Sequence, residues 1–412
     1  LAENQESAAR EGAIEIVYWK SYRVDQAAVD KFNAEHPDIH VTAEVFPDHA
    51  STLQKIQVQA SAGSAQMPNV IQLDTCMTAT VDSVAPLLDL KPYLEKSDTL
   101  KLENFYDTFQ DEAYVGDKVA GLHVCANCDV LFYNKEIFEE AGVDATTIRT
   151  WADFEAACDK ILTTGKVPVY VGGKSVNNIA NLFEVMAPGF LTNEDVADNQ
   201  GAALLDGSFD WETNWTPMAQ KLDDWLQKGY FNKDILTASD DSSIQALANG
   251  DGAIVISGNH TITQALSYNP DAKLGIMAIP SPNENGKVYV SSGEGTCYGM
   301  WKDSEYPDEC RKLLEYLAKD EISIKIATIN GKIPAMEGVT NDDEYVTKEF
   351  NIMSSAFGDD LLFVNYFDRA YLPSGMWNDM GVSGNEVFMN PGQGVGKCVE
   401  TIKMAYDEKI SQ

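Results

Sequence analysis

The first third of the chain alternates short apolar runs with longer amphipathic stretches. β-branched and aromatic residues fill Ile14–Trp19, Ile39–Val45 and Val70–Leu73, which predicts three strands. The stretches between them carry apolar residues at helical spacing, and the first ends at Pro37, which cannot continue a helix. Strand, helix and strand in this order predict right-handed crossovers and a mainly parallel sheet.

A second alternation begins near Val130 and extends towards the C-terminus. It predicts strands at residues 130–133, 167–171, 253–256 and 273–279. It predicts helices at residues 135–141, 151–162, 215–228, 243–248, 308–319 and 321–329. The rest is predicted to be helical, with loops around residues 373–384.

The predicted fold class is α/β, with two lobes that each contain a mainly parallel sheet flanked by helices. No Pro- or Ser-rich linker separates the halves, so we expect the chain to cross between the lobes on several strands. The expected boundaries are a flexible leader at residues 1–12, lobe I at 13–122 plus 262–328, and lobe II at 123–261 plus 329–412.

Composition narrows the classes of function. At 412 residues and 44% apolar content, the chain can build two cores. Its 30 Lys and Arg against 64 Asp and Glu give a net charge of −34, which disfavours binding to nucleic acid or anionic lipid. No stretch approaches the ~20 uncharged apolar residues of a membrane helix. Residues 1–12 lack the basic and apolar regions of a signal peptide, and a polar leader of this kind suits a protein held to a membrane by an N-terminal lipid.

Seven cysteines are too few for a disulfide scaffold. The close pair Cys125-x-x-Cys128, with His123 just before it, is compatible with a redox or zinc site. The pair lies in a predicted strand, however, and no second Cys-x-x-Cys occurs. Unpaired buried thiols or one disulfide are therefore the favoured interpretations, and we expect no metal site.

Familiar catalytic motifs are missing. The five histidines do not form His-Glu-x-x-His, and Pro168 stands where a phosphate-binding loop ending at Lys174-Ser175 needs glycine. Gly-x-Ser-x-Gly does not occur either. Pairs of carboxylates carry no information among 64 acidic residues, although glycoside hydrolysis requires such a pair. We therefore predict no enzyme, no catalytic residue and no cofactor.

Several local patterns occur in a characteristic order. The most specific is Leu131–Gly142, which contains Tyr-Asn-Lys, then Phe and Ala-Gly, and is followed by Thr150-Trp151-x-x-Phe154. Residues 67–74, 250–258 and 331–335 fit the same arrangement. Together these patterns span nearly the whole chain, and they resemble the family 1 extracellular solute-binding proteins, the maltose-binding-like group. Most residues of the Tyr133–Phe154 block also suit structural roles, since Asn and Thr cap helices and Gly adopts a left-handed turn.

The resemblance implies the two-lobed periplasmic-binding-protein fold, with a ligand between the lobes where strand ends and their following loops meet. Sugars need aromatic rings against their apolar faces and polar groups for their hydroxyls. The candidate ligand-binding residues at these ends are Trp19, Tyr22, Arg23, Asp74, Asn127, Asp129, Asn259, His260, Glu294, Tyr298 and Trp377. Family members commonly place an aromatic ring after the position of Gly258, whereas Asn259 and His260 stand here, so a polar contact replaces stacking or stacking comes from elsewhere. Trp19 fits the core equally well.

The resemblance also implies a function. It implies an extracytoplasmic solute-binding protein that captures an oligosaccharide and delivers it to the membrane permease of an ABC importer. The expected form is a monomer, held by a lipid at the extracellular face of the membrane or free in a periplasm. Two alternatives remain open. The same fold could bind a non-sugar solute such as an amine, an anion or a metal complex, and a secreted glycan-cleaving enzyme is the other.

Overall fold

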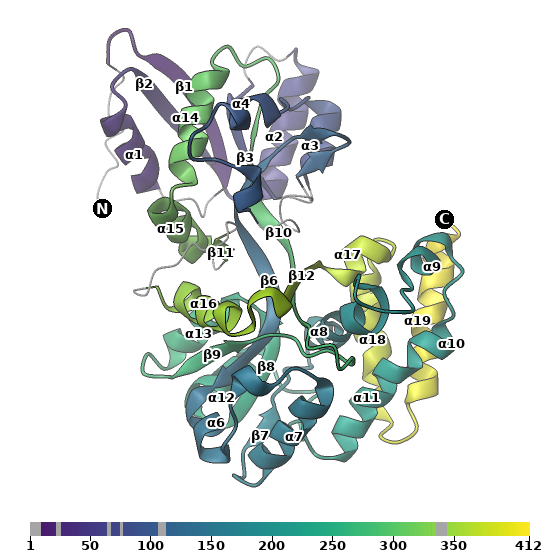
Figure 1. Cartoon of the computed structure of the whole chain (residues 1–412). Helices are drawn as coiled ribbons and strands as arrows, with labels where there is room; N and C mark the ends of the chain where they lie inside the picture. Colours follow the sequence, from purple (N-terminus) through teal and green to yellow (C-terminus); the bar gives the residue numbers. More distant parts are fainter. Residues whose placement is uncertain are drawn as a thin grey trace. The chain divides into compact units, whose positions relative to one another are not determined.

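The structure is a computed structural model that describes residues 10–21, 26–63, 67–74, 77–105, 113–330, 332–334 and 344–412. The chain forms two compact units (Figure 1). Unit 1 comprises Leu1–Asn127 and Gly293–Lys348, and unit 2 comprises Cys128–Ser292 and Glu349–Gln412. The chain therefore passes from one unit to the other three times, as the absence of a linker predicts. Tyr22 and Arg23 lie outside the described residues.

Unit 1 begins with the predicted alternation. Strands β1 (Ile14–Ser21), β2 (Ile39–Phe46) and β3 (Val70–Asp74) are parallel, with β1 between the other two. Helices α1 (Gln26–Glu35) and α2 (His49–Ser61) connect them (Figure 1). The other elements of unit 1 are α3 (Thr78–Val84), α4 (Lys91–Glu95), η2 (Leu102–Asn104), β4 (Tyr114–Val115), β5 (Lys118–Val119), α14 (Pro307–Leu317), α15 (Asp320–Asn330) and β11 (Ile333–Pro334).

Two long strands, β6 (Leu122–Asn134) and β10 (Val288–Met300), run through the points where the chain changes unit. In unit 1, β10 is antiparallel to both β3 and β6, and β11 is antiparallel to β6. In unit 2, β6 is antiparallel to β8 (Gly252–Gly258) and to β9 (Leu274–Met277). Strand β7 (Val167–Val169) is parallel to β8, and β12 (Leu361–Asn365) is parallel to β10. Both units thus contain mixed rather than mainly parallel pairing.

Helices surround the strands of unit 2. They are α6 (Lys135–Ala141), η3 (Ala145–Thr147), α7 (Trp151–Leu162), α8 (Val176–Ala187), η4 (Pro188–Thr192), α9 (Gly201–Asp206), α10 (Trp211–Asn214), α11 (Thr216–Gln227), α12 (Asp240–Asn249), α13 (His260–Tyr268), η5 (Gly358–Asp360), α17 (Phe367–Tyr371), α18 (Met376–Met389) and α19 (Val395–Ile410). Helix α16 (Tyr345–Phe357) contains the third crossing, at Lys348–Glu349. No helix among the described residues is both long and apolar enough to cross a membrane.

The unit boundaries differ from the expected ones in three segments. Residues 262–292 belong to unit 2, because β9 pairs with Leu131–Asn134 and Ile279 bridges to Tyr289. Residues 329–348 belong to unit 1, together with residues 123–127, because β11 pairs with Cys125 and Ala126. Residues 262–292 and 329–348 thus each belong to the unit that contains the part of β6 with which their strand pairs.

Capping residues fix the start of the helices in the predicted Tyr133–Phe154 block. The Asn134 side chain accepts hydrogen bonds from the backbone N–H groups of the first turn of α6, and Thr150 forms a capping box with Asp153 at the start of α7. Gly142 ends α6 in the left-handed conformation, with φ of 69°. These structural roles are confirmed.

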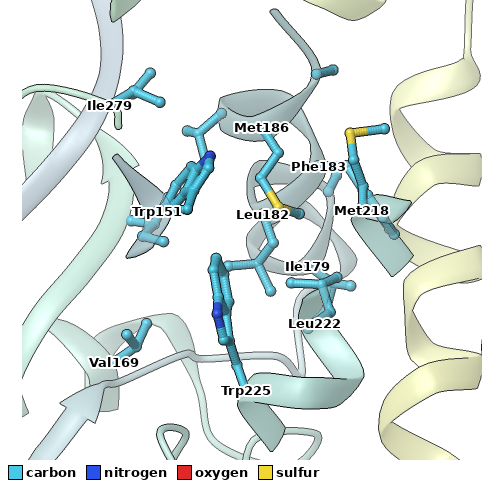
Figure 2. Packing of buried hydrophobic residues seen from close by; sticks show 14 of the residues in the cluster. Trp151, Val169, Ile179, Leu182, Phe183, Met186, Met218, Leu222, Trp225 and Ile279 are labelled. Atoms are coloured by element: carbon cyan, nitrogen blue, oxygen red, sulfur yellow. The ribbon is translucent and has the colours of Figure 1, made fainter. Parts of the chain in front are cut away.

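The core of unit 2 is built around α8. Figure 2 shows Trp151 and Trp225 beside α8 residues, among them Leu182 and Met186. Helix α18 packs along α8 and α19 (Figure 1). The predicted loop at residues 373–384 is wrong over most of its length, since α18 begins at Met376. Two of its glycines lie within α18 where α8 comes close: a Cβ at Gly381 would lie 2.3 Å from the carbonyl oxygen of Val176, and one at Gly384 2.5 Å from Cγ2 of Ile179. These two allow close helix packing and do not mark a turn.

Candidate functional site

The candidate site lies at one edge of the strands of unit 2. The parallel strands β7 and β8 end there, and β6 contributes Asp129, which pairs with Gly258 at the end of β8. Ligands of α/β proteins bind where parallel strands end and their following loops begin. The segments that follow β7 and β8 lead into α8 and α13, so both helices begin close to this edge.

Asn259 and His260 begin helix α13. The Asn259 side chain is only 3% exposed, and its Oδ1 accepts the backbone N–H of Cys128 at 3.0 Å. The ring of His260 is exposed and faces Gly258, where a Cβ would lie 3.0 Å from Nδ1 of His260 and 3.3 Å from Oδ1 of Asp129. Partial loss of water lowers the pKa of His260, against the opposing effect of Asp240, so the imidazole is neutral at pH 7. Asn259 holds the strand, and His260 is available to a ligand.

Two asparagines at the start of α8 connect neighbouring helices. Asn178 Nδ2 donates to the carbonyl oxygen of Gly172 and to Oδ1 of Asp240, both at 2.9 Å. Asn177 Oδ1 accepts the indole N–H of Trp377 at 2.8 Å. Trp377 is the second residue of α18 and is partly buried against the core of unit 2. Its ring is therefore held at one side and remains partly open to solvent.

Three carboxyl groups and one guanidinium group lie together behind this edge. The carboxyl group of Glu184 on α8 is 0% exposed and accepts the backbone N–H groups of Phe367, at 2.5 Å, and Asp368, at 3.4 Å. Burial, with Asp368 and Asp129 nearby, raises the pKa of Glu184 well above its usual value. Burial therefore favours the protonated form of Glu184.

The two neighbouring carboxyl groups have raised pKa values as well. Burial raises the pKa of Asp129 to about 7, with Arg369 opposing the shift and Asp368 adding to it. Burial raises the pKa of Asp368 to about 6, although a hydrogen bond from Glu184 and backbone N–H groups stabilise its carboxylate. The group carries less negative charge than three carboxylates would. It offers both donors and acceptors at neutral pH.

Chemically, this edge supplies an aromatic ring, an imidazole, carboxyl groups and a guanidinium group. Such a set can pack against an apolar face and hydrogen-bond several hydroxyl groups. Among the residues that the structure describes, no three His, Cys, Asp or Glu side chains are arranged to hold a metal ion. Four of the sequence candidates, Asp129, Asn259, His260 and Trp377, belong to this edge.

Two candidates of unit 1 lie in its core. Trp19 is 2% exposed, with its ring edge-on to Phe46 at 5.4 Å. Tyr298 is 0% exposed and lies 5.9 Å from the ring of Tyr18. Neither ring has an exposed face, which is at odds with the predicted ligand contact. Of the two roles that the sequence allows for Trp19, the structure shows the core role.

The remaining candidates of unit 1 are less fully described. Asn127 is partly buried in β6. Asp74 is the last residue of β3 and Glu294 lies within β10, but the described part of the chain does not include their side chains. These three, with Tyr22 and Arg23, stay predictions.

The described cysteines are all buried, and no disulfide joins any two of them. Of the two interpretations that the sequence favours, buried thiols therefore fit Cys125 and Cys128 better than a disulfide; Cys76 lies outside the described residues. Burial, with Asp129 nearby, raises the pKa of the Cys128 thiol, which keeps it protonated and unreactive.

Sequence reasoning missed several residues at this edge. Asn177, Asn178 and Asp240 hold Trp377 and the helix starts, but short polar residues before a helix usually serve as caps. Glu184 did leave a signal, because it is the one charged residue in the otherwise apolar run at 182–191. Asp368 and Arg369 left none among 64 acidic and 30 basic residues.

Known proteins match this chain along most of its length. Residues 27–351 match the family model of bacterial extracellular solute-binding proteins. The melibiose/raffinose/stachyose-binding protein MelE of Bacillus subtilis is 24% identical over 362 residues, which cover 86% of this chain and 79% of MelE. A Bacillus subtilis binding protein solved in an open conformation has a TM-score of 0.77 at 20% identity, and the match covers 98% of this chain and 99% of that one.

A sugar transporter protein of Bacillus licheniformis, solved in complex with stachyose, has a TM-score of 0.66 at 22% identity and covers 96% of this chain and 100% of its own. Both structural matches agree in fold with the resemblance found in the sequence. The family match spans far more than half of the chain. The chain belongs to the bacterial extracellular solute-binding protein family.

Proposed function

We propose that this protein captures an oligosaccharide and delivers it, chemically unchanged, to the permease of an ABC importer. The observation that supports this most is the combination at the edge of unit 2. Trp377 is fixed by its N–H to Asn177, while Asp129, His260 and Arg369 supply hydrogen-bonding groups. A pyranose has apolar C–H faces and a rim of hydroxyl groups, and this combination suits both.

Relatives support the same class of ligand. MelE is named for melibiose, raffinose and stachyose, and relatives from Bacillus subtilis and Halalkalibacterium halodurans are named as arabinooligosaccharide-binding proteins. Because their identities to this chain lie between 22% and 30%, they favour an oligosaccharide as the class of ligand without fixing its linkage or length.

Calorimetric titration of the purified chain tests the proposal. The panel contains raffinose, stachyose, arabinotriose, maltotriose and xylotriose, with sucrose and glucose as short controls. At least one trisaccharide or tetrasaccharide is expected to bind with a Kd on the order of micromolar or tighter. Chromatography after overnight incubation is expected to return the sugar intact, and a cleaved product would favour the glycan-cleaving alternative. If none of the sugars in the panel binds, the proposal is contradicted.

A cationic solute is the second candidate, since Asp129, Glu184 and Asp368 converge at the same edge. The sugar remains the preferred ligand, because Trp377 offers a partly exposed ring to the apolar face of a pyranose. Titration with spermidine separates the two. Tight binding of spermidine that falls steeply with added salt would favour the amine.

Delivery requires the protein outside the membrane, in keeping with its family, and we propose a monomer. Light scattering after size-exclusion chromatography is expected to give a mass close to 45.2 kDa.

Retention by a lipid preceding the polar leader is part of the proposal, and membrane fractions of cells that express the full gene test it. In proteoliposomes that contain the cognate importer, the sugar-loaded protein is expected to stimulate ATP hydrolysis more than the empty protein does.

A further inference from the structure

Glu184 is an unusual residue in the core of unit 2. It lies in α8, whose residues from Asn178 to Ala187 are all buried, and it is the only charged side chain of that helix. A buried carboxyl group costs free energy unless it is hydrogen-bonded. Its partners are the backbone N–H groups of Phe367 and Asp368 and the side chain of Asp368.

These partners form the turn that joins β12 to α17. The backbone N–H of Tyr366 donates to the carbonyl oxygen of Ser292 at 3.1 Å, and the first turn of α17 then carries Asp368 and Arg369. The guanidinium group of Arg369 lies over the ring of Tyr366, 5.2 Å from its centroid, and acts on Asp129. Glu184 thus ties the central helix of unit 2 to the segment that sets the surroundings of Asp129.

Other charged groups near α8 are engaged elsewhere. On α18, Asp379 pairs with Lys409 at 2.8 Å, and on α11, Lys221 pairs with Glu155 at 2.9 Å. Strand β8 carries no charged side chain. The groups that act on Glu184 are therefore those of α17 and β6, and no basic side chain is among them.

We propose that Glu184 is a positioning residue for ligand binding: its buried carboxyl group holds the Tyr366–Arg369 turn, so that Asp129 and Arg369 keep the arrangement in which they meet the ligand. This inference rests on the proposed function. Glu184 itself has no exposed surface and touches no ligand. Small displacements of a binding group lower affinity, because the shell behind the contact residues sets their geometry.

Two substitutions separate positioning from simple packing. Glu184→Met keeps the length and fills the space but removes both acceptors. Glu184→Gln keeps an acceptor for the N–H of Phe367 and a donor towards Asp368, which is the pattern of a protonated carboxyl group. Asp223→Ala is the matched control, because Asp223 is also buried and accepts a backbone N–H, that of Gly392, at 2.8 Å.

Hydrogen exchange followed by mass spectrometry on the ligand-free protein gives the first readout. Glu184→Met is expected to raise the exchange rate of the amides at 366–369 about tenfold or more, while Glu184→Gln and Asp223→Ala leave it unchanged. Equal exchange in Glu184→Met and the wild type would overturn the inference. Should Glu184→Met not fold, the same comparison is made with Glu184→Ala.

Affinity for the tightest-binding sugar of the panel gives the second readout. Glu184→Met is expected to weaken binding about tenfold, Glu184→Gln to stay within about threefold of the wild type, and Asp223→Ala to match it. Fast amide exchange in Glu184→Met together with wild-type sugar affinity would also overturn the inference. An equal loss of sugar affinity in Glu184→Met and Glu184→Gln would overturn it as well. If the wild-type protein binds no sugar, the proposed function is contradicted. In that case hydrogen exchange still decides whether Glu184 holds the Tyr366–Arg369 turn.

Discussion

Two tryptophans, one in each unit, have different surroundings although the sequence marked both as candidate ligand contacts. Trp19 lies near the end of β1 in unit 1, where Phe46, Ile71 and Leu73 belong to the same apolar cluster. Trp377 lies at the start of α18 in unit 2, where Asn177 binds its N–H. The role of a ring is thus set by the side chains that neighbouring elements bring to it, and its position at a strand or helix end does not decide that role.

The largest effect is expected at Trp19. Trp19→Ala should lower the free energy of unfolding by about 3–5 kcal/mol, because it leaves a cavity in the core of unit 1. Trp377→Ala, which removes a partly exposed ring, should cost about 1 kcal/mol. Urea unfolding followed by circular dichroism compares the two. Equal losses would remove the distinction between a core ring and a site ring.

The packing behind Trp377 comes next. Gly381→Ala should lower the free energy of unfolding by about 1–3 kcal/mol, because the new methyl group meets the carbonyl oxygen of Val176 and pushes α18 from α8. Gly396→Ala is the control, since nothing lies within 4 Å of a Cβ there, and it should stabilise α19 by roughly 0.5–1 kcal/mol. Thermal unfolding of both variants measures the difference, and a neutral Gly381→Ala would show that α18 adjusts freely.

Sugar affinity separates the two rings in a different way. Trp377→Ala should weaken binding of the preferred oligosaccharide roughly tenfold, or about 1.4 kcal/mol, because the stacked ring is lost. Trp377→Phe keeps a ring without the N–H to Asn177 and should fall between the Ala variant and the wild type. Trp19→Phe, the matched change in the core of unit 1, should leave affinity unchanged in calorimetric titration. An unchanged Kd for Trp377→Ala would exclude a stacking role.

The last prediction, whose effect is the smallest per pH unit, concerns the pH dependence of stability. The pKa of Asp129 is about 7 in the folded protein and ~3.9 in an unfolded chain, so the folded state binds more protons between these values. Stability therefore falls as pH rises from about 4 to 7, by at most about 1.4 kcal/mol per pH unit for this carboxyl group. Asp129→Asn should flatten the dependence of the melting temperature on pH. An unchanged curve would mean that Asp129 is ionised in the folded protein over this range.

The sequence predicted the regular parts of the fold well, because local chemistry determines them. The β-branched runs of β1, β2 and β3 formed parallel strands, and Asn134 and Thr150 capped the helices that they precede. The resemblance to solute-binding proteins was confirmed by the family match. Mixed strand pairing was missed, because strand direction depends on how the chain returns to each unit.

The candidate site was harder to predict. Glycines usually end helices, so α18 was mistaken for a loop, although Gly381 is required by the backbone of α8. The group formed by Asp129, Glu184 and Asp368 joins residues of three distant segments. Among 64 acidic residues, no spacing rule selects these three. Tertiary contacts that bring distant segments together are therefore the information that the sequence pattern lacked.

The three passages of the chain between the units also bear on how the protein folds during synthesis. Unit 1 lacks β11 and part of β10 until residues beyond Gly293 emerge, and unit 2 lacks α17, α18 and α19 until the last tenth or so of the chain is present. Synthesis from the N-terminus therefore completes unit 1 only after most of unit 2 has been made. The two hydrophobic interiors are thus expected to close late and close together in time.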